Sequence, residues 1–111
     1  MLNSSDILRG YTDTIILAQL YDEDRYGYVI SKNVQEITGG ELQLKEATLY
    51  TTFRRLEGAG VIESYWGSEN AGARRRYYHL TDAGRKLYEE NITDWRKYRA
   101  VISRLIGLED A

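Results

Sequence analysis

The 111-residue sequence contains no cysteine and only one histidine. The missing thiols exclude disulfides, thiolate metal sites and a cysteine nucleophile, and they suit a reducing cytoplasm. Met1–Asp6 lacks the basic segment and apolar run that mark a signal peptide. The longest purely aliphatic run, residues 15–18, is far too short to cross a bilayer. We therefore expect a cytoplasmic chain with a single core and neither a metal nor a cofactor.

Residues suited to catalysis are scarce. His79 stands between Tyr78 and Leu80 in an expected strand, and no acid or nucleophile lies near it in the sequence. Its simplest interpretation is a part-exposed strand residue. Three glutamates, at positions 57, 63 and 69, have no histidine or cysteine companions at metal-ligand spacing. The sequence therefore predicts a protein that is not an enzyme.

The charge balance is slightly acidic, with a formal net charge of -2 and a pI of about 5.4. This balance argues against nucleic-acid binding, for which a basic domain is usual. However, arginines gather in two short stretches, at 54–55 and 74–76, while acids gather at 22–24, 89–90 and 109–110. A local basic surface can bind phosphates while distant acids limit non-specific binding. The ten tyrosines suit surfaces that are partly apolar and partly wet, including phosphate contacts.

The segment that organises the chain is residues 45–62, KEATLYTTFRRLEGAGVI, which predicts one helix followed by a strand. Leu49, Phe53 and Leu56 share a stripe that can anchor the helix to a core. Glycines 58 and 60 end the helix, because glycine adopts the left-handed backbone of a helix stop. Lys45 is a poor N-cap, so the helix begins at Glu46 or takes its cap from elsewhere.

The second stripe of this helix is hydroxylic and basic. It contains Thr48, either Thr51 or Thr52, and Arg55. Threonine hydrogen-bonds to bases or phosphates, and arginine binds guanine or phosphate with two donors. Such a helix can lie in a DNA major groove. Taken alone, the segment fits equally well a core helix with an ordinary polar face.

The surrounding segments predict a winged helix. Ser4–Asp6 cap a first helix that reaches about Tyr21, and a second helix runs from about Tyr26 to Ile37, where residues 38–40 stop it. Residues 41–44 form a short strand or an extended connector, so the organising helix completes a helix-turn-helix. Strands at 61–66 and 73–80, joined by the loop 67–72, form a two-stranded wing. Its arginines reach phosphates or a narrow minor groove, or else belong to a solvated hairpin tip.

A last helix, capped by Thr81, is expected to run to about Ile106. Its apolar residues alternate by three and four over about three heptads, which is typical of a coiled-coil seam. A second copy of the chain would cover this seam and set two reading helices about 34 Å apart. The alternative is folding back onto its own core through Leu87 and Tyr88. The expected dimer interface consists of Leu8, Tyr11, Ile15, Tyr88, Ile92, Trp95, Ile102, Leu105 and Ile106.

These elements predict an α+β fold that is mostly α: a winged helix-turn-helix with a two-stranded β wing and a long C-terminal dimerisation helix. Residues 1–80 are expected to form the DNA-binding part. Residues 81–111 are expected to form the dimerisation helix, and the two parts to make one compact unit.

The joined motifs resemble the winged helix of PadR-type transcriptional regulators over nearly the whole chain. The resemblance rests on Tyr26-Gly27-Tyr28, EATLYTTFRRLEGAGVIESYW, and RRRYYHLTDAG after a glycine-bearing loop. The single C-terminal helix is similar to that of the small PadR subfamily. EATLYT, SYWG and a tryptophan in the last helix most resemble its multidrug-sensing repressors.

The resemblance implies a homodimeric repressor that binds double-stranded DNA at a pseudo-palindromic promoter element. An efflux-pump promoter is implied by the closest resemblance, and a phenolic-acid response by the wider family. The resemblance, together with the hydroxylic and basic stripe of the organising helix, implies a set of DNA-contacting residues. They are Tyr26, Tyr28, Lys45, Thr48, Tyr50, Thr51, Arg54, Arg55, Arg74, Arg75 and Arg76.

The resemblance also places Trp95 where drug-sensing members stack a flat aromatic ligand between subunits. Ile92, Asp94 and Arg99 lie within a turn of it and can line the same space. Packing alone is the alternative role for Trp95. Two alternative hypotheses are a PadR-type repressor without a ligand and a winged-helix module that binds protein instead of DNA.

Overall fold

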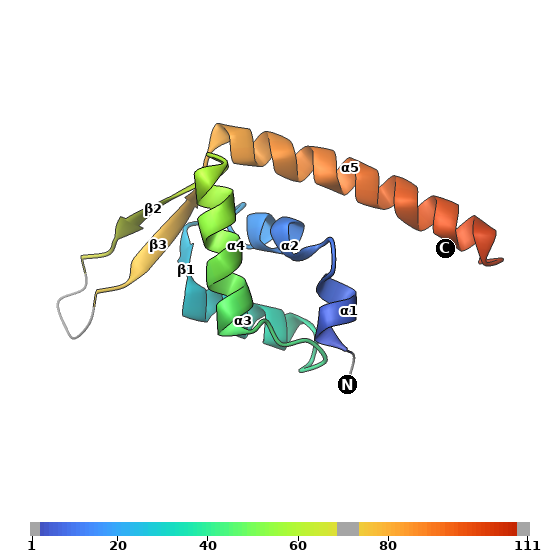
Figure 1. Cartoon of the computed structure of the whole chain (residues 1–111), viewed down its shortest axis with the longest axis horizontal. Coiled ribbons are helices and arrows are strands. Elements are labelled where there is room, and N and C mark those ends of the chain that lie inside the picture. The colour runs from blue at the N-terminus through green and yellow to red at the C-terminus, as the bar shows by residue number, and fades with distance from the viewer. Residues whose placement is uncertain (1–2, 69–73, 109–111) are drawn as a thin grey trace.

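The computed structural model describes residues 3–68 and 74–108, which contain five helices and a small antiparallel sheet (Figure 1). The elements, in chain order, are α1 (Ser4–Leu8), α2 (Thr12–Gln19), β1 (Arg25–Tyr26), α3 (Gly27–Ile37), α4 (Glu46–Gly58), β2 (Ile62–Trp66), β3 (Arg76–Leu80) and α5 (Asp82–Leu105). This confirms the mostly helical α+β fold with a winged helix-turn-helix. None of the helices in the described residues is both long and apolar enough to cross a membrane.

The first helix is broken, and the expectation of one continuous helix to Tyr21 is wrong. Gly10 adopts a positive φ of 82°, a conformation that ends helices, between α1 and α2. The Leu8 carbonyl at the end of α1 joins the two helices, because it accepts hydrogen bonds from the Tyr11 N–H (2.9 Å) and from the Thr12 hydroxyl (3.0 Å). After the break, Ile16 and Leu17 of α2 face the core, while Tyr11 just before α2 is 39% exposed.

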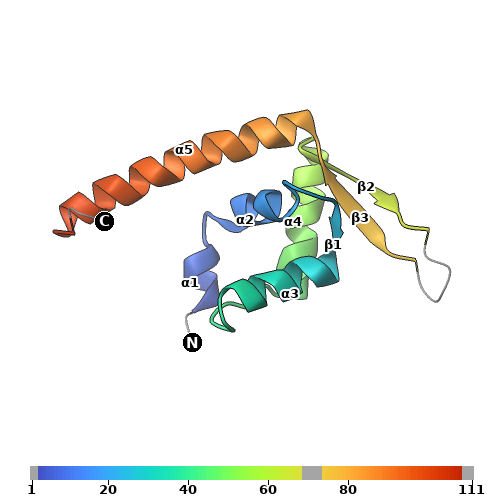
Figure 2. The same cartoon turned by 180° about the vertical axis from the view of Figure 1, so that it is seen from behind.

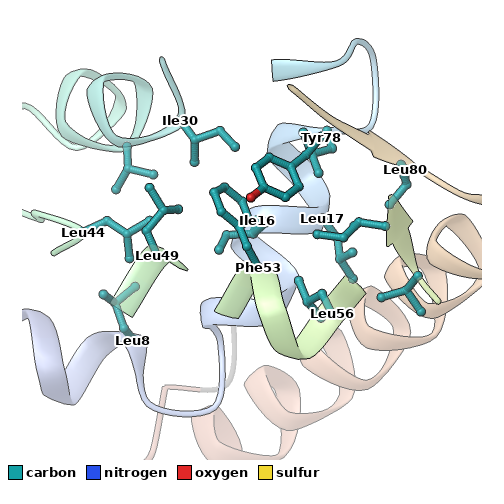
Figure 3. Packing of buried hydrophobic residues seen from close by; sticks show 14 of the residues in the cluster. Leu8, Ile16, Leu17, Ile30, Leu44, Leu49, Phe53, Leu56, Tyr78 and Leu80 are labelled. Atoms are coloured by element: carbon teal, nitrogen blue, oxygen red, sulfur yellow. The ribbon is translucent and has the colours of Figure 1, made fainter. Parts of the chain in front are cut away.

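The core lies where α2, α3 and α4 meet the sheet (Figure 3). The expected anchor stripe of α4 is confirmed, since Leu49, Phe53 and Leu56 are all buried. The Phe53 ring stacks on the Tyr78 ring of β3 at a centroid distance of 3.8 Å. Burying a side chain of this size stabilises a fold by about 1.5–3 kcal/mol. The stack therefore fixes α4 against the wing strands.

The second and third helices of the motif, α3 and α4, cross closely at Gly27. A β-carbon there would lie 3.1 Å from the Tyr50 hydroxyl and 3.2 Å from Leu49 Cδ2. Gly39 and Gly40 have positive φ and stop α3 as expected. The spacing of its apolar residues predicts an inward side formed by Ile30, Val34 and Ile37, with either Tyr28 or Val29. Ile30 and Val34 are buried and Val29 is half-buried, whereas Tyr28 is 68% exposed. The prediction is wrong for Ile37, which is 75% exposed.

The sheet has one more strand than the sequence analysis expected. The segment 22–25 was expected to be a charged turn and Tyr26 to begin a helix, but Arg25 and Tyr26 form β1 and pair with Tyr78 and Tyr77 of β3. The order is β1-β3-β2, with Ile62 opposite Leu80 and Trp66 opposite Arg76. The expected loop 67–72 and the start of the returning strand fall partly outside the described residues.

The last helix, α5, begins as expected at Thr81, whose hydroxyl accepts from the Gly84 N–H at 3.1 Å. Its first half lies across α2, where Tyr88 packs on Tyr21 (5.0 Å between centroids) and the Asn91 amide donates to the Thr14 hydroxyl (2.9 Å). Its second half extends away from the other helices (Figures 1 and 2). Leu87 and Tyr88 of α5 therefore pack against the chain's own core, while the apolar residues of its second half are exposed.

Candidate nucleic-acid interface

The outward face of α4 carries hydroxyl and basic side chains. Thr48, Thr51 and Arg54 are exposed, and Tyr50 is 40% exposed. Thr52 is buried, and its hydroxyl donates to the Thr48 carbonyl at 2.8 Å. Of the two threonines that the sequence left open, Thr51 therefore lies on the exposed face.

The two neighbouring arginines of α4 have different surroundings. Arg54 lies on the outward face, where one of its Nη atoms donates to the Thr51 hydroxyl at 3.4 Å. Arg55 points to the flank, and its Nη1 binds both carboxylate oxygens of Asp13 in α2 at 2.7 and 2.6 Å. The structure thus leaves Arg54 toward solvent and ties Arg55 to the helix behind it.

Lys45 immediately precedes α4 and is exposed, and α4 begins at Glu46 without a side-chain N-cap. Lys45 and Thr48 line a shallow hollow between α4 and the first helices, together with Arg9 and Thr12. The hollow lies beside the start of the exposed face of α4. Cationic and hydroxyl groups therefore continue past the end of that helix.

Tyr26 and Tyr28 stand at the start of α3, as expected, and belong to a longer row of tyrosines. The ring centroid of Tyr26 lies 6.5 Å from that of Tyr28 and 5.4 Å from that of Tyr77. The centroid of Tyr77 lies 5.7 Å from that of Tyr65. The row crosses all three strands on the sheet face opposite the core, because Tyr65, Tyr77 and Tyr26 are register partners. The sequence gives no register, so it did not join these residues.

The three wing arginines do not form one patch. The Arg75 guanidinium lies 4.8 Å from the centre of the Tyr26 ring. Those of Arg74 and Arg76 each lie 5.7 Å from the centre of the Trp66 ring. The arginine run is therefore divided between the two faces of the wing.

One wing face contacts the last turn of α4. The Ser64 hydroxyl of β2 donates to Glu57 of α4 at 2.6 Å and accepts from Arg76 at 3.0 and 2.8 Å. Arg76 also lies 3.6 Å from the Glu57 carboxylate. Burial raises the pKa of the nearby Tyr78 hydroxyl, and Arg76 partly opposes that rise. These contacts fix the wing strands beside the last turn of α4.

A polar cluster on the other wing face holds the sheet to the turn before β1. Asp24 accepts from the Tyr65 hydroxyl at 2.5 Å and lies 2.8 Å from His79 Nδ1. Burial alone would raise the Asp24 pKa, but the contacts with Tyr65 and His79 lower it, while Asp24 raises the pKa of Tyr65 to about 12. This carboxylate is not apparent beside His79 in the sequence, because Asp24 lies 55 residues away in the chain.

A second candidate site lies between α2 and α5. Trp95 and Ile92 line an apolar hollow of about 480 Å³ with Tyr11, Ile15 and the unanticipated Thr14 and Ala18. Arg99 lies 5.5 Å from the Trp95 ring, and Asp94 lines the adjoining hollow with Trp95. The four expected ligand residues are therefore neighbours, although only Ile92 and Trp95 share the apolar wall. Among the described residues, no cluster of potential metal ligands occurs.

A helix-turn-helix followed by a β wing, with an exposed hydroxylic and basic face on its third helix, defines a winged-helix protein of the nucleic-acid-binding class. Residues 16–90 match the transcriptional regulator PadR-like family. The chain belongs to this family, whose members are DNA-binding regulators and not enzymes.

Solved structures agree with this assignment. A transcriptional regulator from Clostridium thermocellum is similar with a TM-score of 0.83 and 45% identity, covering 89% of this chain and 96% of that one. A PadR family transcription regulator from Clostridium difficile gives a TM-score of 0.78 and 36% identity over 87% and 99% of the two chains. A Bacillus subtilis PadR in complex with operator DNA shares the fold, with a TM-score of 0.66, 22% identity and coverage of 73% and 46%.

Proposed function

We propose that the chain is a homodimeric repressor that binds a pseudo-palindromic promoter element in the cytoplasm. The observation that carries the proposal is the exposed hydroxylic and basic face of α4, beside which Ser64, Glu57 and Arg76 fix the wing. The related Bacillus subtilis PadR, solved with operator DNA, supports DNA as the partner.

In this proposal α4 enters the major groove, and the start of α3 and the wing contact flanking phosphates. Arg55 contributes least, because Asp13 already binds its guanidinium. The proposed contacts are those of Tyr26, Tyr28, Lys45, Thr48, Tyr50, Thr51, Arg54, Arg55, Arg74, Arg75 and Arg76. Residues 1–80 act as the DNA-binding part and residues 81–111 as the dimerisation helix.

Dimerisation is supported by the apolar side chains that α5 leaves in solvent. They include Ile102, Leu105 and Ile106, of which Leu105 is 75% exposed. Contiguous exposed apolar residues of this kind mark interaction surfaces. A second copy of α5 matches them in chemistry and length, and a two-fold dimer spaces two α4 helices for successive major grooves. Tyr11, Ile15, Ile92 and Trp95 continue the same surface.

The hollow beside Trp95 supports release of DNA by a planar aromatic ligand, as in a multidrug-sensing repressor. An indole on each side of a two-fold axis offers two flat apolar surfaces to such a molecule. A ligand that favours one separation of the α5 helices also favours one separation of the α4 helices. It shifts DNA affinity only if it binds the two states with different affinity. In a ligand-free regulator the same residues serve dimer packing alone.

A second candidate function is a winged-helix module that binds a protein. The acidic pI of about 5.4 favours it. The arginines beside α4 favour DNA, because a protein-binding wing has no need of clustered guanidinium groups.

The deciding experiment titrates the purified protein onto its own upstream intergenic DNA at several salt concentrations, with a scrambled duplex as the control. Specific binding with a steep negative dependence on salt establishes the DNA-binding role. Weak and equal binding to both duplexes would instead favour a distant operator or a protein partner, and a genome-wide selection of bound DNA separates these two. Adding planar cationic dyes to the complex then tests the Trp95 hollow.

A further inference from the structure

Trp66 is a large apolar side chain that the buried core does not use. It ends β2 and is 54% exposed, whereas Ile62 at the other end of the same strand is 1% exposed. Because side chains alternate along a strand, Ile62, Ser64 and Trp66 share one face of the wing. Ser64 on that face is hydrogen-bonded to Glu57 of α4. Trp66 therefore lies on the wing face that contacts α4, beyond the part of that face that the core covers.

Two guanidinium groups gather at this indole. Arg76 is the register partner of Trp66, and its Cζ lies 5.7 Å from the indole centroid. Arg74 has its Cζ at the same distance. A guanidinium stacked on an aromatic ring keeps its N–H donors available at its edges, and the ring limits the rotamers it samples. Arg76 already donates from Nε and Nη2 to Ser64, so an anion at the indole would be bound by Arg74 and by the Nη1 edge of Arg76.

The two wing faces differ in charge. On the Tyr65 face, Asp24 places a carboxylate directly beside the exposed ring. On the Trp66 face, the nearest carboxylate in contact is that of Glu57, and it is engaged by Ser64 and Arg76. The Tyr65 face also carries Arg75, whose guanidinium lies 4.8 Å from the Tyr26 ring. A phosphate that approaches Trp66 meets two guanidinium groups, whereas one that approaches Tyr65 meets the carboxylate of Asp24. The local charge therefore favours a phosphate at Trp66 over one at Tyr65.

We propose that Trp66 is a DNA-contacting residue of the wing, packing on the sugar-phosphate backbone and positioning Arg74 and Arg76 on adjacent phosphates. The contact rests on the proposed DNA-binding function but is independent of base sequence, because sugar and phosphate are the groups recognised. It therefore operates on operator and scrambled duplexes alike.

The test compares Trp66→Leu with Tyr65→Leu, the same loss of an exposed aromatic ring on the opposite wing face. Dissociation constants are measured for both duplexes at several salt concentrations, beside the thermal midpoint of each variant. Trp66→Leu leaves the net charge unchanged. We expect it to weaken binding about fivefold to tenfold on both duplexes and to lower the salt slope by about 1, as for the loss of one phosphate contact. Tyr65→Leu is expected to bind as the wild type does.

Trp66→Phe tests whether an aromatic platform is what matters. It is expected to restore most of the affinity and the salt slope lost in Trp66→Leu. Subtracting the fluorescence of Trp66→Phe from that of the wild type isolates the emission of Trp66. This difference signal is expected to change when the scrambled duplex is added at low salt.

The outcomes separate this inference from the proposed function. Wild-type affinity and slope in Trp66→Leu would overturn the role of Trp66 and leave specific DNA binding intact. Equal losses in Trp66→Leu and Tyr65→Leu, with lowered thermal midpoints, would also overturn it, because folding of the wing would then be the cause. Loss of operator preference with a retained effect of Trp66 would reject the operator proposal alone. A wild type that binds neither duplex at low salt would overturn both.

Discussion

The two long helices, α4 and α5, expose opposite kinds of side chain. α4 buries Leu49, Phe53 and Leu56 and turns hydroxyl and basic groups outward. The far half of α5 buries little and turns aliphatic and aromatic groups outward, among them Ile102 and Leu105. Each helix is amphipathic. The apolar side of α4 is covered within the chain, whereas the apolar side of the far half of α5 is exposed.

The difference shows which partner each helix suits. A polar outward face on a firmly anchored helix matches a hydrated, charged surface such as DNA. An apolar outward face matches another protein surface, because water opposes its exposure. The polar contacts around α4 and the wing are also fixed by internal hydrogen bonds, such as that from Ser64 to Glu57.

Removing the ring that anchors α4 has the largest expected effect. Phe53→Ala should lower the free energy of unfolding by about 3–5 kcal/mol, because it empties the stack with Tyr78 inside the core. Chemical denaturation at several protein concentrations measures this loss, which should not depend on concentration. Leu105→Ala is the matched change on α5, and its cost should vanish on dilution. A similar cost for both variants in dilute protein would contradict the contrast.

Placing a charge on the exposed seam of α5 has the next largest effect. Ile102→Glu should raise the dimer dissociation constant about a hundredfold, or ~2.7 kcal/mol, because the carboxylate would be buried against the second copy. Sedimentation across a concentration series measures it. Ala100→Glu adds the same charge two residues away, on nearly the opposite side of the helix, and should leave the dimer intact. Unchanged sedimentation of Ile102→Glu would remove α5 from the interface.

The neighbouring arginines of α4 give a smaller, matched comparison. Arg54→Ala should weaken operator binding about tenfold, because Arg54 lies on the outward face. Arg55→Ala removes the same charge but breaks a contact with Asp13, so it should cost mainly stability, up to about 1 kcal/mol for an exposed ion pair. Fluorescence anisotropy and thermal unfolding separate the two effects. A larger loss of affinity in Arg55→Ala would reverse the assignment of the faces.

The smallest effect concerns the polar cluster of the wing. Tyr65 has a pKa raised to about 12, chiefly by its hydrogen bond to Asp24, so its neutral form is favoured in the fold. Its contribution to stability is fully present below the unfolded pKa of about 10 and is lost as pH rises through about 12. The absorbance of tyrosinate in wild type minus Tyr65→Phe should titrate near the higher value. Asp24→Asn should move that titration toward 10, and an unmoved midpoint would exclude Asp24 as the cause.

The sequence predicted the parts of the fold that are governed by local rules. The stripe of Leu49 and Phe53, the glycine stop of α3 and the cap at Thr81 each follow from spacing or from backbone chemistry within one helix. The break at Gly10 was missed, because the apolar residues on either side of it also fit one continuous helix. β1 was missed because two residues carry no periodicity and form a strand only by pairing with β3.

The candidate site was predicted less completely than the fold, because more of it depends on contacts between segments that lie far apart in the sequence. The sequence located the arginine run but not which aromatic rings its members meet on each wing face, because that depends on the register of Trp66 with Arg76. It treated Arg54 and Arg55 alike, because the ion pair with Asp13 joins residues 42 positions apart. Contacts of this length depend on how the helices pack, and one sequence does not encode them in any local pattern.

The close fit at Gly84 makes α5 a lever with a defined fulcrum. A β-carbon at this position would lie 2.1 Å from the Val61 carbonyl oxygen, so the helix backbone meets the start of the wing without an intervening side chain. From there, residues 85–105 of α5 extend about 32 Å. A turn of about 5° at the fulcrum carries the far end of the helix ~3 Å. Conversely, ångström-scale shifts where two chains meet correspond to rotations of only a few degrees beside the wing.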